Sequence, residues 1–510
     1  MKQIHKKFIE VAKKHPAKIA VYDQTLATDY TYEKILIAAL IFQKKIEKYA
    51  EKHIGIMIPT SAGAFISLLA VLFSGKIPVL INYATGASQN CLYAQAKVGC
   101  ETIITSRNLL KKLEQEPVEG MVFLEDLKKE ISLWAKLKGA LRSKLGTVLL
   151  SRTVHLGKEE DTAVIIFTSG SEKEPKAVQL SHANIAHQLV TFPKIFDLYA
   201  SDIFLGNLPV FHIFGFTLFW LALNCGASIV THANPLDYAK VAASIKQYGI
   251  TFVLGTPTFL YGYLKRSSSG DFSSIRYLIA GADKVHDHLR QAYRQKHDLE
   301  ILEGYGTTET SPVITSNTPK QNRPGSVGKA IDGMQIKIVD CATDEELPPG
   351  EMGKILVKGA SVMKGYFADL EETTLRLKDG WYETGDMGIL DEDSFLWHQG
   401  RLKRFVKVGG EMISLIRVED ELDRLVPQDV VVCVVDVPDP KKGAEIVAAI
   451  TTSSIDKRKI QKQMRQKLPG IAVPKEFYVI EDIPMMGNGK VNFKEVEKIC
   501  RQIKQKERGK

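Results

Sequence analysis

Short apolar runs alternate with longer stretches of helical spacing over the first two thirds of the chain. The apolar runs, rich in β-branched residues, lie at 53–59, 77–82 and 101–106, and the helical stretches that follow them lie at 62–75, 91–98 and 108–115. Such alternation is typical of βαβ units. From about residue 30 to residue 340 the sequence therefore predicts parallel β-sheet covered by helices.

The pattern changes near residue 335. Strand-like runs separated by Gly, Pro and Asp turns predict a mostly β portion over 335–398. After the segment 400–410, a compact strand and helix pattern begins again, and it is long enough for a small separate domain. We expect an α/β fold with a large N-terminal domain (1–399) of helix-covered sheets plus the β-rich portion. The segment 400–410 would be a hinge, followed by a small mobile α+β C-terminal domain (411–510).

Three further stretches have a distinctive pattern. The stretch 62–75 is too short to cross a bilayer, and the stretch 204–230 is interrupted by polar residues and a proline. We therefore expect both to be buried in the core. The segment 126–157 is basic and amphipathic, which predicts a helical surface insertion with a solvated face.

Composition and charge narrow the class of partner. The 510 residues are 45% apolar, which is typical of a globular protein with an ample core, and the net charge is +9. No basic run is interleaved with stacking aromatics, so an acidic small molecule or an acidic protein is a better candidate partner than nucleic acid. The six cysteines sit singly, which predicts neither a zinc site nor a disulfide framework. The N-terminal segment lacks the pattern of a signal peptide, so we expect a cytoplasmic protein. The sequence does not decide whether the protein contacts the inner membrane peripherally, and it does not decide the oligomeric state.

A hydroxyl-rich loop follows an apolar strand-like run in "IIFTSGSEKEPKAVQLSH", residues 165–182. Its residue types suit a phosphate, because hydroxyls, backbone N–H groups and an ammonium all attract anions. A Walker-type loop would need GxxxxGK followed by Ser or Thr, and the chain has only Gly170 at a comparable place. An ordinary turn between a strand and a helix capped near Ser181 explains the loop equally well. The loop alone leaves both interpretations open.

Seven motifs follow one another in a fixed order along the chain. They are "FTSGSEKEPKAV" (167–178), "LPVFHIFG" (208–215), "IAGADKV" (279–285), "LEGYGTTETSP" (302–312), "GWYETGD" (380–386), "GRLKRFVKVGGEMIS" (400–414) and "PMMGNGKVNF" (484–493). In this order they resemble the acyl-adenylate-forming superfamily of acyl-CoA synthetases, luciferases and peptide-synthetase adenylation domains. Details such as "GTPTFL", "AGADKV" and "GEMIS" look most like the acyl-acyl carrier protein synthetase half of the bifunctional bacterial protein Aas.

The resemblance implies an AMP-forming ligase that uses ATP and Mg²⁺. A fatty acid carboxylate would attack the α-phosphate of ATP, and the acyl group of the resulting acyl-AMP would pass to the phosphopantetheine thiol of acyl carrier protein. A long-chain acyl-CoA synthetase is the alternative, and a catalytically weak lipid- or nucleotide-binding protein is an alternative of another class. The apolar makeup of 204–230 and of "LGTPTFLYGYL" favours a hydrophobic acid. A wall of the acyl pocket is the alternative to buried core for 204–230. The chain length of the acid stays open.

By the same resemblance, one loop and one motif hold the nucleotide phosphates. Thr308 would contact the α-phosphate, and Glu309 would hold Mg²⁺, a hard cation suited to oxygen ligands. Carboxylate and phosphate repel each other, so donors and cations already in place must cancel that repulsion. The phosphate loop would consist of Thr168, Ser169, Gly170, Ser171 and Lys176.

The resemblance also implies a site for the nucleoside. Asp386 would accept hydrogen bonds from both ribose hydroxyls, and Arg401 would also point to the ribose. His212 would gate the acyl pocket, or it is a core histidine with satisfied hydrogen bonds. The adenine pocket would consist of Gly281, Ala282, Asp283, Gly304, Tyr305 and Gly306, with the Tyr305 ring as its flat aromatic wall.

The C-terminal part carries the remaining predicted residues. Lys490, in "GNGK", would bridge the acyl carboxylate and the α-phosphate as the bond forms, as a flexible point charge can. Gly409 and Gly410 would line the tunnel for pantetheine. We expect the pivot of the small domain near Lys403 and Arg404, where relatives commonly carry an aspartate.

The phosphate loop departs from the family at two positions. Lys173 and Ala177 stand where the family has glycine, which permits φ > 0 and a close backbone approach. Lys173 is either an extra phosphate contact or a solvated lysine. These departures motivate the alternative of a catalytically weak binding protein.

Overall fold

The computed structural model describes residues 3–168, 175–409, 411–427, 430–439, 443–452, 454–485 and 491–508. The chain divides into two compact units. The first unit comprises Met1–Ile336 and Val357–Tyr382, and the second comprises Lys337–Leu356 and Glu383–Lys510. The domain boundaries expected from the sequence at 399 and 411 stay a prediction.

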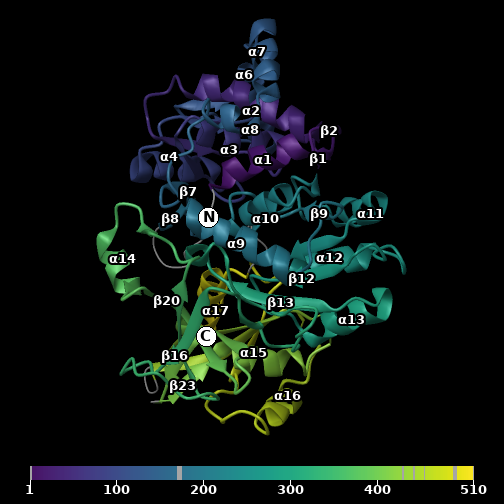
Figure 1. Cartoon of the computed structure of the whole chain (residues 1–510). Coiled ribbons are helices and arrows are strands. Elements are labelled where there is room, and N and C mark those ends of the chain that lie inside the picture. The colour runs from purple at the N-terminus through teal and green to yellow at the C-terminus, as the bar shows by residue number, and fades with distance from the viewer. Residues whose placement is uncertain are drawn as a thin grey trace. The chain divides into compact units, whose positions relative to one another are not determined.

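The first unit contains two large sheets (Figure 1). The nine-stranded sheet has the order β15-β14-β13-β12-β11-β9-β10-β1-β2. Its strands are β1 (Ile19–Asp23), β2 (Thr28–Thr31), β9 (Ile203–Gly206), β10 (Ser228–Thr231), β11 (Phe252–Gly255), β12 (Tyr277–Ala280), β13 (Ile301–Gly306), β14 (Val313–Ser316) and β15 (Lys329–Ala330).

The seven-stranded sheet has the order β18-β8-β7-β4-β3-β5-β6. Its strands are β3 (His53–Ile56), β4 (Ile77–Leu80), β5 (Ile103–Thr105), β6 (Met121–Phe123), β7 (Thr162–Phe167), β8 (Ala177–Ser181) and β18 (Gly365–Tyr366). The central strands of both sheets pair in parallel, as at β4-β3-β5 and β9-β10. The prediction of βαβ units is therefore confirmed.

Helices cover these sheets. They are α1 (Ile4–Lys14), α2 (Tyr32–Ile46), α3 (Ala62–Phe73), α4 (Ala87–Val98), α5 (Arg107–Leu113), α6 (Leu124–Lys129), α7 (Leu133–Lys144), α8 (Thr147–Ser151), α9 (His182–Ile195), α10 (Ile213–Asn224), α11 (Tyr238–Tyr248), α12 (Pro257–Arg266), α13 (Asp287–His297) and α14 (Leu370–Arg376), with a 3-10 turn η1 (Thr308–Thr310). The basic segment predicted as a helical insertion contains most of α6 and all of α7 and α8.

The two most apolar stretches each contain a buried helix, α3 in one and α10 in the other. These two helices pack together through Phe65 of α3. Its ring centroid lies 5.1 Å from that of Phe219 and 4.8 Å from that of Trp220, both in α10. All three side chains are buried, and each buried aromatic or aliphatic side chain stabilises the fold by about 1.5–3 kcal/mol. Among the described residues, no helix is both long and apolar enough to span a bilayer. The prediction that these stretches are core is confirmed.

Two β-structures precede the C-terminal fold. A five-stranded sheet has the order β16-β17-β20-β19, with β21 paired to β20, and a two-stranded hairpin follows it. The strands are β16 (Met334–Val339), β17 (Met352–Gly359), β19 (Leu377–Lys378), β20 (Trp381–Leu390) and β21 (Leu396–Arg401), then β22 (Phe405–Val408) and β23 (Glu411–Ser414) after a short turn η2 (Leu402–Arg404). The mostly β portion predicted over 335–398 is confirmed.

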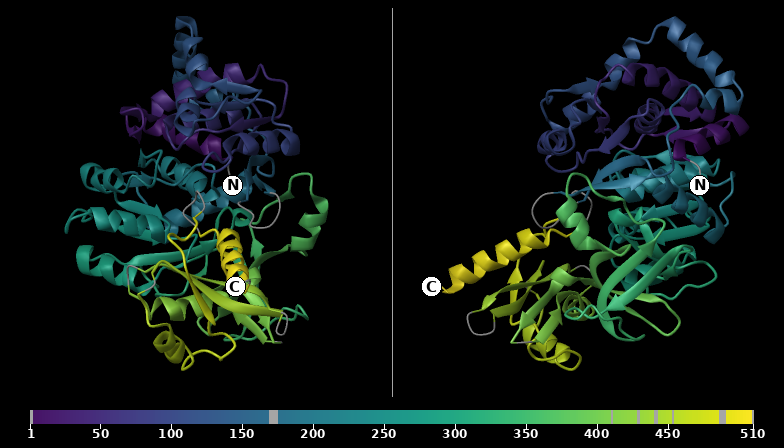
Figure 2. Two further views of the ribbon diagram at one scale, coloured as in Figure 1. Left: turned by 180° about the vertical axis from the view of Figure 1, so that it is seen from behind. Right: turned by 60° about the vertical axis from the view of Figure 1, so that its left-hand side comes forward.

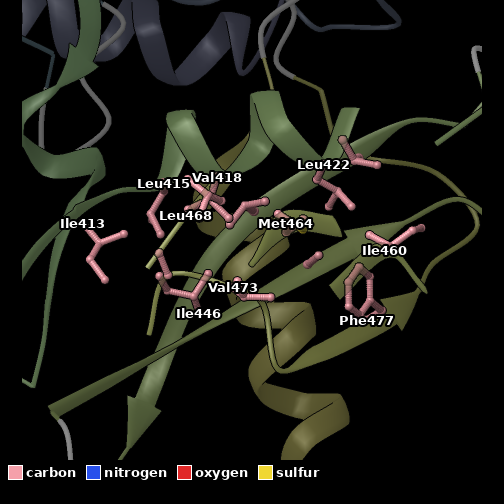
Figure 3. Close-up of a cluster of buried hydrophobic side chains, with 14 of the residues drawn as sticks. Ile413, Leu415, Val418, Leu422, Ile446, Ile460, Met464, Leu468, Val473 and Phe477 are labelled. Carbon is pink, nitrogen blue, oxygen red and sulfur yellow. The ribbon is translucent and has the colours of Figure 1, made fainter. Parts of the chain in front are cut away.

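The C-terminal fold is built on a three-stranded sheet, β24-β25-β26. Its elements are β24 (Val432–Asp439), β25 (Gly443–Ile450), β26 (Glu476–Val479), α15 (Leu415–Asp423), α16 (Lys457–Met464) and α17 (Phe493–Arg508). Residues of α15 and α16 such as Val418 and Met464 pack with Ile446 of β25 in one apolar cluster (Figure 3). Alternate strand residues, including Val447, pack with Val496 of α17 in a second cluster. This alternation is what a sheet covered on both faces requires.

Candidate active site

The hydroxyl-rich loop connects two strands of a hairpin. Strands β7 and β8 pair antiparallel, with Phe167 opposite Ala177. The Thr168 N–H donates to the Lys176 carbonyl at 2.9 Å, and the Lys176 N–H donates to the Thr168 hydroxyl at 3.2 Å. The loop thus joins strand to strand, and the helix capped by Ser181 begins only after β8. Ser169, Gly170 and Ser171 of the predicted phosphate loop, and Lys173, lie outside the described residues.

Lys176 is held by an acidic helix terminus. Its ammonium forms an ion pair with Glu372 of α14, and Glu372 also accepts a hydrogen bond from Arg376 Nε at 3.1 Å. Burial alone would raise the pKa of Glu372, but the hydrogen bonds from Lys176 and Arg376 outweigh it and lower that pKa. The Lys176 ammonium also lies 5.2 Å from the ring centroid of Tyr366. A phosphate bound by Lys176 would therefore compete with Glu372.

The carboxyl ends of β12 and β13 bring two glycine motifs together. A Cβ built on Gly281 would lie 3.6 Å from the Gly304 carbonyl oxygen, so the backbones of the two motifs approach closely. At Gly306 a Cβ would lie 1.7 Å from the Pro312 carbonyl oxygen, so only glycine fits there. Tyr305 between these glycines is partly buried. Ala282 and Asp283 are exposed after β12. The described geometry thus gathers the residues predicted for the adenine pocket at one sheet edge.

Glu309 is a buried carboxylate beside two phenols. It lies in η1, is 8% exposed, and accepts a hydrogen bond from the Tyr366 hydroxyl at 2.9 Å. Burial first, and the Glu309 charge second, raise the pKa of Tyr366 well above its ordinary value. The same two causes raise the pKa of Tyr382. Both phenols therefore stay protonated and can donate hydrogen bonds. The neighbouring Thr308 is partly buried.

The site suits a metal that arrives with a phosphate rather than a metal held by protein alone. Within the described residues, no group of three or more His, Cys, Asp or Glu side chains is arranged to hold a metal ion. Glu309 offers one carboxylate, of which Tyr366 engages one oxygen. Mg²⁺ is commonly bound by one or two carboxylates plus substrate phosphates and water. The single buried carboxylate of Glu309 fits Mg²⁺ in that mode, and its role as the protein ligand stays a prediction.

An apolar pocket adjoins the segment that carries Glu309. Its lining comes from α9, α10, β11 and the start of β14, and includes Phe214, Leu218 and Val313. Gln188 of α9 donates to the Val313 carbonyl at 2.8 Å, which fixes α9 against this segment. The cavity has a volume of about 20 Å³, and none of the described residues that line it is charged. The lining residues are Gln188, Phe192, Phe214, Thr217, Leu218, Leu221, Phe252, Leu254, Pro312 and Val313.

His212 stands at the N-terminal end of α10. Its ring is partly buried and lies 4.6 Å, centroid to centroid, from the ring of Phe211, which in turn contacts Tyr83. Its backbone carbonyl accepts the Phe216 N–H at 2.9 Å and so begins the helix. These contacts position the ring in an aromatic cluster, and the gating role of His212 stays a prediction.

The predicted ribose residues lie together in the second unit. Asp386 of β20 pairs across the sheet with Arg401 of β21, and Arg401 Nε lies 3.7 Å from Asp386 Oδ1. His398 Nε2 lies 3.8 Å from Asp386 Oδ2. Asp386 is 5% exposed, and its backbone N–H donates to the Thr384 hydroxyl at 3.1 Å. The carboxylate is thus positioned by the strand, with one basic side chain near each oxygen.

Arg404 of the predicted pivot is anchored within the second unit. Its guanidinium donates to the Val434 carbonyl at 2.8 Å and to Glu419 at 3.0 Å, and it lies 3.8 Å from the ring centroid of Phe493. Lys403 beside it is exposed. We therefore place Arg404 with the C-terminal sheet and its helices. Gly409 adopts a positive φ of 58° in the turn between β22 and β23, whereas Gly410 and Lys490 lie outside the described residues.

Three residues of the site were missed by sequence reasoning. Tyr366 is 57 residues from Glu309 along the chain, and Glu372 is 196 residues from Lys176. Tyr382 belongs to the recognised motif "GWYETGD", but nothing in the motif indicates that its phenol faces a glutamate. Only "KGYF", residues 364–367, could have drawn attention, as an aromatic residue next to a glycine.

Comparison with known proteins gives consistent results. The family described as AMP-binding enzyme matches residues 8–367, and the AMP-binding enzyme C-terminal domain matches residues 426–490. A feruloyl-CoA synthase from Amycolatopsis sp is 31% identical over 347 residues, which cover 66% of this chain and 70% of the relative. A long-chain-fatty-acid–CoA ligase from Bacillus subtilis (strain 168) is 28% identical over 525 residues, which cover 94% of this chain and 91% of the relative.

Solved structures have the same fold. ATP-bound MatB from Rhodopseudomonas palustris has a TM-score of 0.85 at 22% identity, covering 99% of this chain and 100% of that chain. The o-succinylbenzoate CoA synthetase of Bacillus subtilis, in complex with its acyl-adenylate intermediate, has a TM-score of 0.85 at 23% identity, covering 98% of each chain. The expected fold class, a large N-terminal α/β domain with a small C-terminal domain, is confirmed. The chain belongs to the AMP-binding enzymes and is an adenylate-forming ligase.

Proposed function

We propose that the protein activates a fatty acid with ATP and transfers the acyl group to the phosphopantetheine thiol of acyl carrier protein. A carboxylate oxygen of the acid attacks the α-phosphorus of ATP, and the bond to pyrophosphate breaks. The thiol sulfur then attacks the carbonyl carbon of acyl-AMP, loses its proton, and AMP leaves. Each step needs anions to be held close together, so fixed donors and cations supply most of the stabilisation.

The apolar pocket beside the Glu309 segment carries the proposal of a fatty acid substrate. Pro312 and Val313 line this pocket and follow directly on the motif that holds Thr308 and Glu309. A pocket without charged lining favours an alkyl or aryl chain over an amino acid. Its volume of about 20 Å³ is far below that of ligand pockets, so an acyl chain can enter only if side chains such as Phe214 move.

We assign the nucleotide to the residues that the glycine motifs and Asp386 supply. Tyr305 would stack on adenine, and Asp386 would accept from the ribose hydroxyls. Thr168, Lys176 and Thr308 would contact the phosphates, after Lys176 exchanges Glu372 for a phosphate oxygen. Mg²⁺ bound by Glu309 would neutralise charge on the phosphates as it develops.

The identity of the thiol is the finer part of the proposal. Resemblance of "AGADKV" and "GEMIS" to the synthetase half of Aas supports acyl carrier protein. Free CoA is the second candidate, and the relatives favour it, since both the Bacillus subtilis fatty acid ligase and the feruloyl-CoA synthase are named for CoA. CoA and carrier protein present the same phosphopantetheine arm, so the arm alone does not separate them.

One experiment separates the acceptors. The protein is incubated with Mg-ATP and a panel of fatty acids, in parallel with holo acyl carrier protein and with CoA, and products are resolved by gel shift and mass. Acyl carrier protein thioester at a higher rate than acyl-CoA supports the proposal. If the thioester forms on CoA alone, the assignment of acyl carrier protein as the acceptor is wrong. If pyrophosphate is not released, or is released without dependence on fatty acid, a catalytically weak binding protein is favoured.

The role of Lys490 has its own test. Because its ammonium would act in forming the acyl-phosphate bond, Lys490→Ala should reduce acyl-adenylate formation on the order of 10²-fold. Thiolysis of supplied acyl-adenylate should change much less. Equal losses in both half-reactions would refute this division of labour.

A further inference from the structure

Exposed apolar side chains gather on α7 and α8. Seventeen large apolar residues are exposed in the described part of the chain, and six of them lie between residues 133 and 149. Singly scattered apolar residues are normal on a protein surface, whereas a contiguous group marks a site of interaction. The six are Leu133, Trp134, Leu137, Leu141, Val148 and Leu149.

The packing of α7 on α2 fixes which face is outward. Gly139 is buried against α2, where an added Cβ would lie 2.6 Å from Ile41 Cγ1, so the two helices approach closely. Arg142 fastens the same face, because its guanidinium donates to the Thr153 carbonyl at 2.9 Å and to Gln43 Oε1 at 3.0 Å. Figures 1 and 2 show α7 at the periphery of the first unit, beside α2.

The opposite face of α7 is an apolar stripe. Leu133, Leu137 and Leu141 recur every four residues, and Trp134 lies next to them on the helix surface. Leu133 is 72% exposed, Trp134 74% and Leu141 69%. These side chains are therefore presented to the surroundings by a helix that is itself firmly attached.

Positive charge borders the stripe. From residue 131 to residue 158 the sequence contains no Asp or Glu, but contains Lys136, Lys138, Arg142, Lys144, Arg152 and Lys158. Lys136 and Lys138 are exposed on the two sides of the stripe. Lys144 forms an ion pair with Glu33 at 2.6 Å, and Arg142 faces α2. Two lysines thus stay directed to the surroundings at the edges of the stripe.

We propose that α7 and α8 bind an anionic phospholipid surface, with α7 lying in the plane of the interface. An apolar stripe of Trp and Leu between lysines is the composition of interfacial helices, whose apolar face enters the headgroup region and whose cations attract anionic lipids. A second copy of the chain fits less well, because an isologous contact would bring the same lysines against each other. This inference is independent of the ligase chemistry and would bring the enzyme to the phase in which fatty acids partition.

The test is cosedimentation of the full chain with vesicles, without nucleotide or fatty acid. Vesicles of phosphatidylcholine with phosphatidylglycerol should bind the protein, and binding should weaken as salt rises. The tryptophan emission, to which the exposed Trp134 contributes, should shift to the blue. Phosphatidylcholine vesicles alone should bind much less.

Three variants separate the apolar contribution to vesicle binding from the electrostatic one. The triple variant Trp134→Gln, Leu137→Gln, Leu141→Gln should lose at least about tenfold in vesicle affinity. Lys136→Gln and Lys138→Gln should lose about fivefold each. The matched control is Leu92→Gln with Leu236→Gln, two exposed leucines elsewhere in the first unit (56% and 54% exposed), which should bind vesicles like the native chain. Circular dichroism and pyrophosphate exchange should be unchanged in all of these variants.

Several results would overturn the inference. They are no vesicle binding by the native chain, equal binding by the triple variant, or loss of binding by the control. Light scattering that shows a native dimer and a monomeric triple variant, without vesicle binding, would instead assign the stripe to a second copy. Loss of carrier-protein binding in the triple variant, again without vesicle binding, would assign it to an acidic protein. Because the vesicle assay contains no nucleotide, absence of vesicle binding would leave the ligase proposal intact. Absence of ligase activity would likewise leave the membrane proposal intact.

Discussion

Two buried glutamates, six residues apart in one segment, differ in the partners that surround their carboxylates. Glu303, 5% exposed, accepts from Arg290 Nε at 3.1 Å, from Arg290 Nη2 at 2.6 Å and from the Gly325 N–H at 3.0 Å. Glu309, 8% exposed, accepts from the Tyr366 phenol at 2.9 Å. Among the ion pairs formed by described residues, none involves Glu309, whereas Glu303 is paired with a cation.

We interpret Glu303 as a structural carboxylate and propose that Glu309 is a functional one. A buried charge is costly unless a cation and hydrogen bonds compensate it, and Arg290 compensates Glu303 while joining α13 to β13. Glu309 carries a charge that the described chain compensates only with a neutral donor. A cation supplied from outside is worth most at such a position, which is why we assign Mg²⁺ to Glu309 and not to Glu303.

The largest effect is expected at Glu309. Glu309→Gln keeps the acceptor for Tyr366 but removes the charge, so fatty-acid-dependent exchange of pyrophosphate into ATP should fall on the order of 10²-fold or more. The melting temperature should stay equal or rise, because an uncompensated buried charge is gone. A loss below about fivefold, or a clear fall in melting temperature, would contradict the assignment.

At Glu303 we expect the opposite balance. Arg290→Met leaves the Glu303 carboxylate buried without its cation, which should lower the free energy of unfolding by about 3 kcal/mol in urea titration. The matched control is Arg294→Met on the same helix, whose pair with Glu300 is exposed and should contribute less than about 1 kcal/mol. Similar losses in the two variants would mean that the buried pair is not special.

Tyr366 should affect the affinity for Mg²⁺ through Glu309 without itself binding the metal. Tyr366→Phe removes a hydrogen bond to the Glu309 carboxylate, so the Mg²⁺ concentration for half-maximal exchange should rise about tenfold. Tyr293→Phe serves as the control, since the Tyr293 phenol donates to the Leu260 carbonyl in a distant part of the unit. A Mg²⁺ dependence unchanged by Tyr366→Phe would separate Tyr366 from the metal.

The smallest effect is expected at the ion pair that holds Lys176. If Lys176 must leave Glu372 to contact a phosphate, Glu372→Gln should tighten ATP binding by up to about fivefold, because a partly exposed pair is worth at most about 1 kcal/mol. Glu371→Gln, at the exposed neighbouring position, should leave ATP affinity unchanged in calorimetry. Weaker ATP binding by Glu372→Gln would show that Glu372 positions Lys176 for the nucleotide.

The sequence predicted the local elements better than the distant contacts. Apolar periodicity located β3, α3 and β17, because burial produces a recognisable pattern of apolar residues within a few consecutive positions. The strand that follows the hydroxyl-rich loop was missed, since its first residues read as part of a turn. Tyr366 and Glu372 were also missed, because a hydrogen bond across 57 residues or an ion pair across 196 leaves no spacing to recognise.

Mass spectrometry of the reaction without any thiol acceptor tests the central claim most directly. The native protein, given Mg-ATP and a panel of fatty acids, should accumulate acyl-AMP with an equal amount of pyrophosphate, and chelation of Mg²⁺ should abolish both. Absence of acyl-AMP with every fatty acid, under conditions in which the protein is folded and binds ATP, would contradict the account.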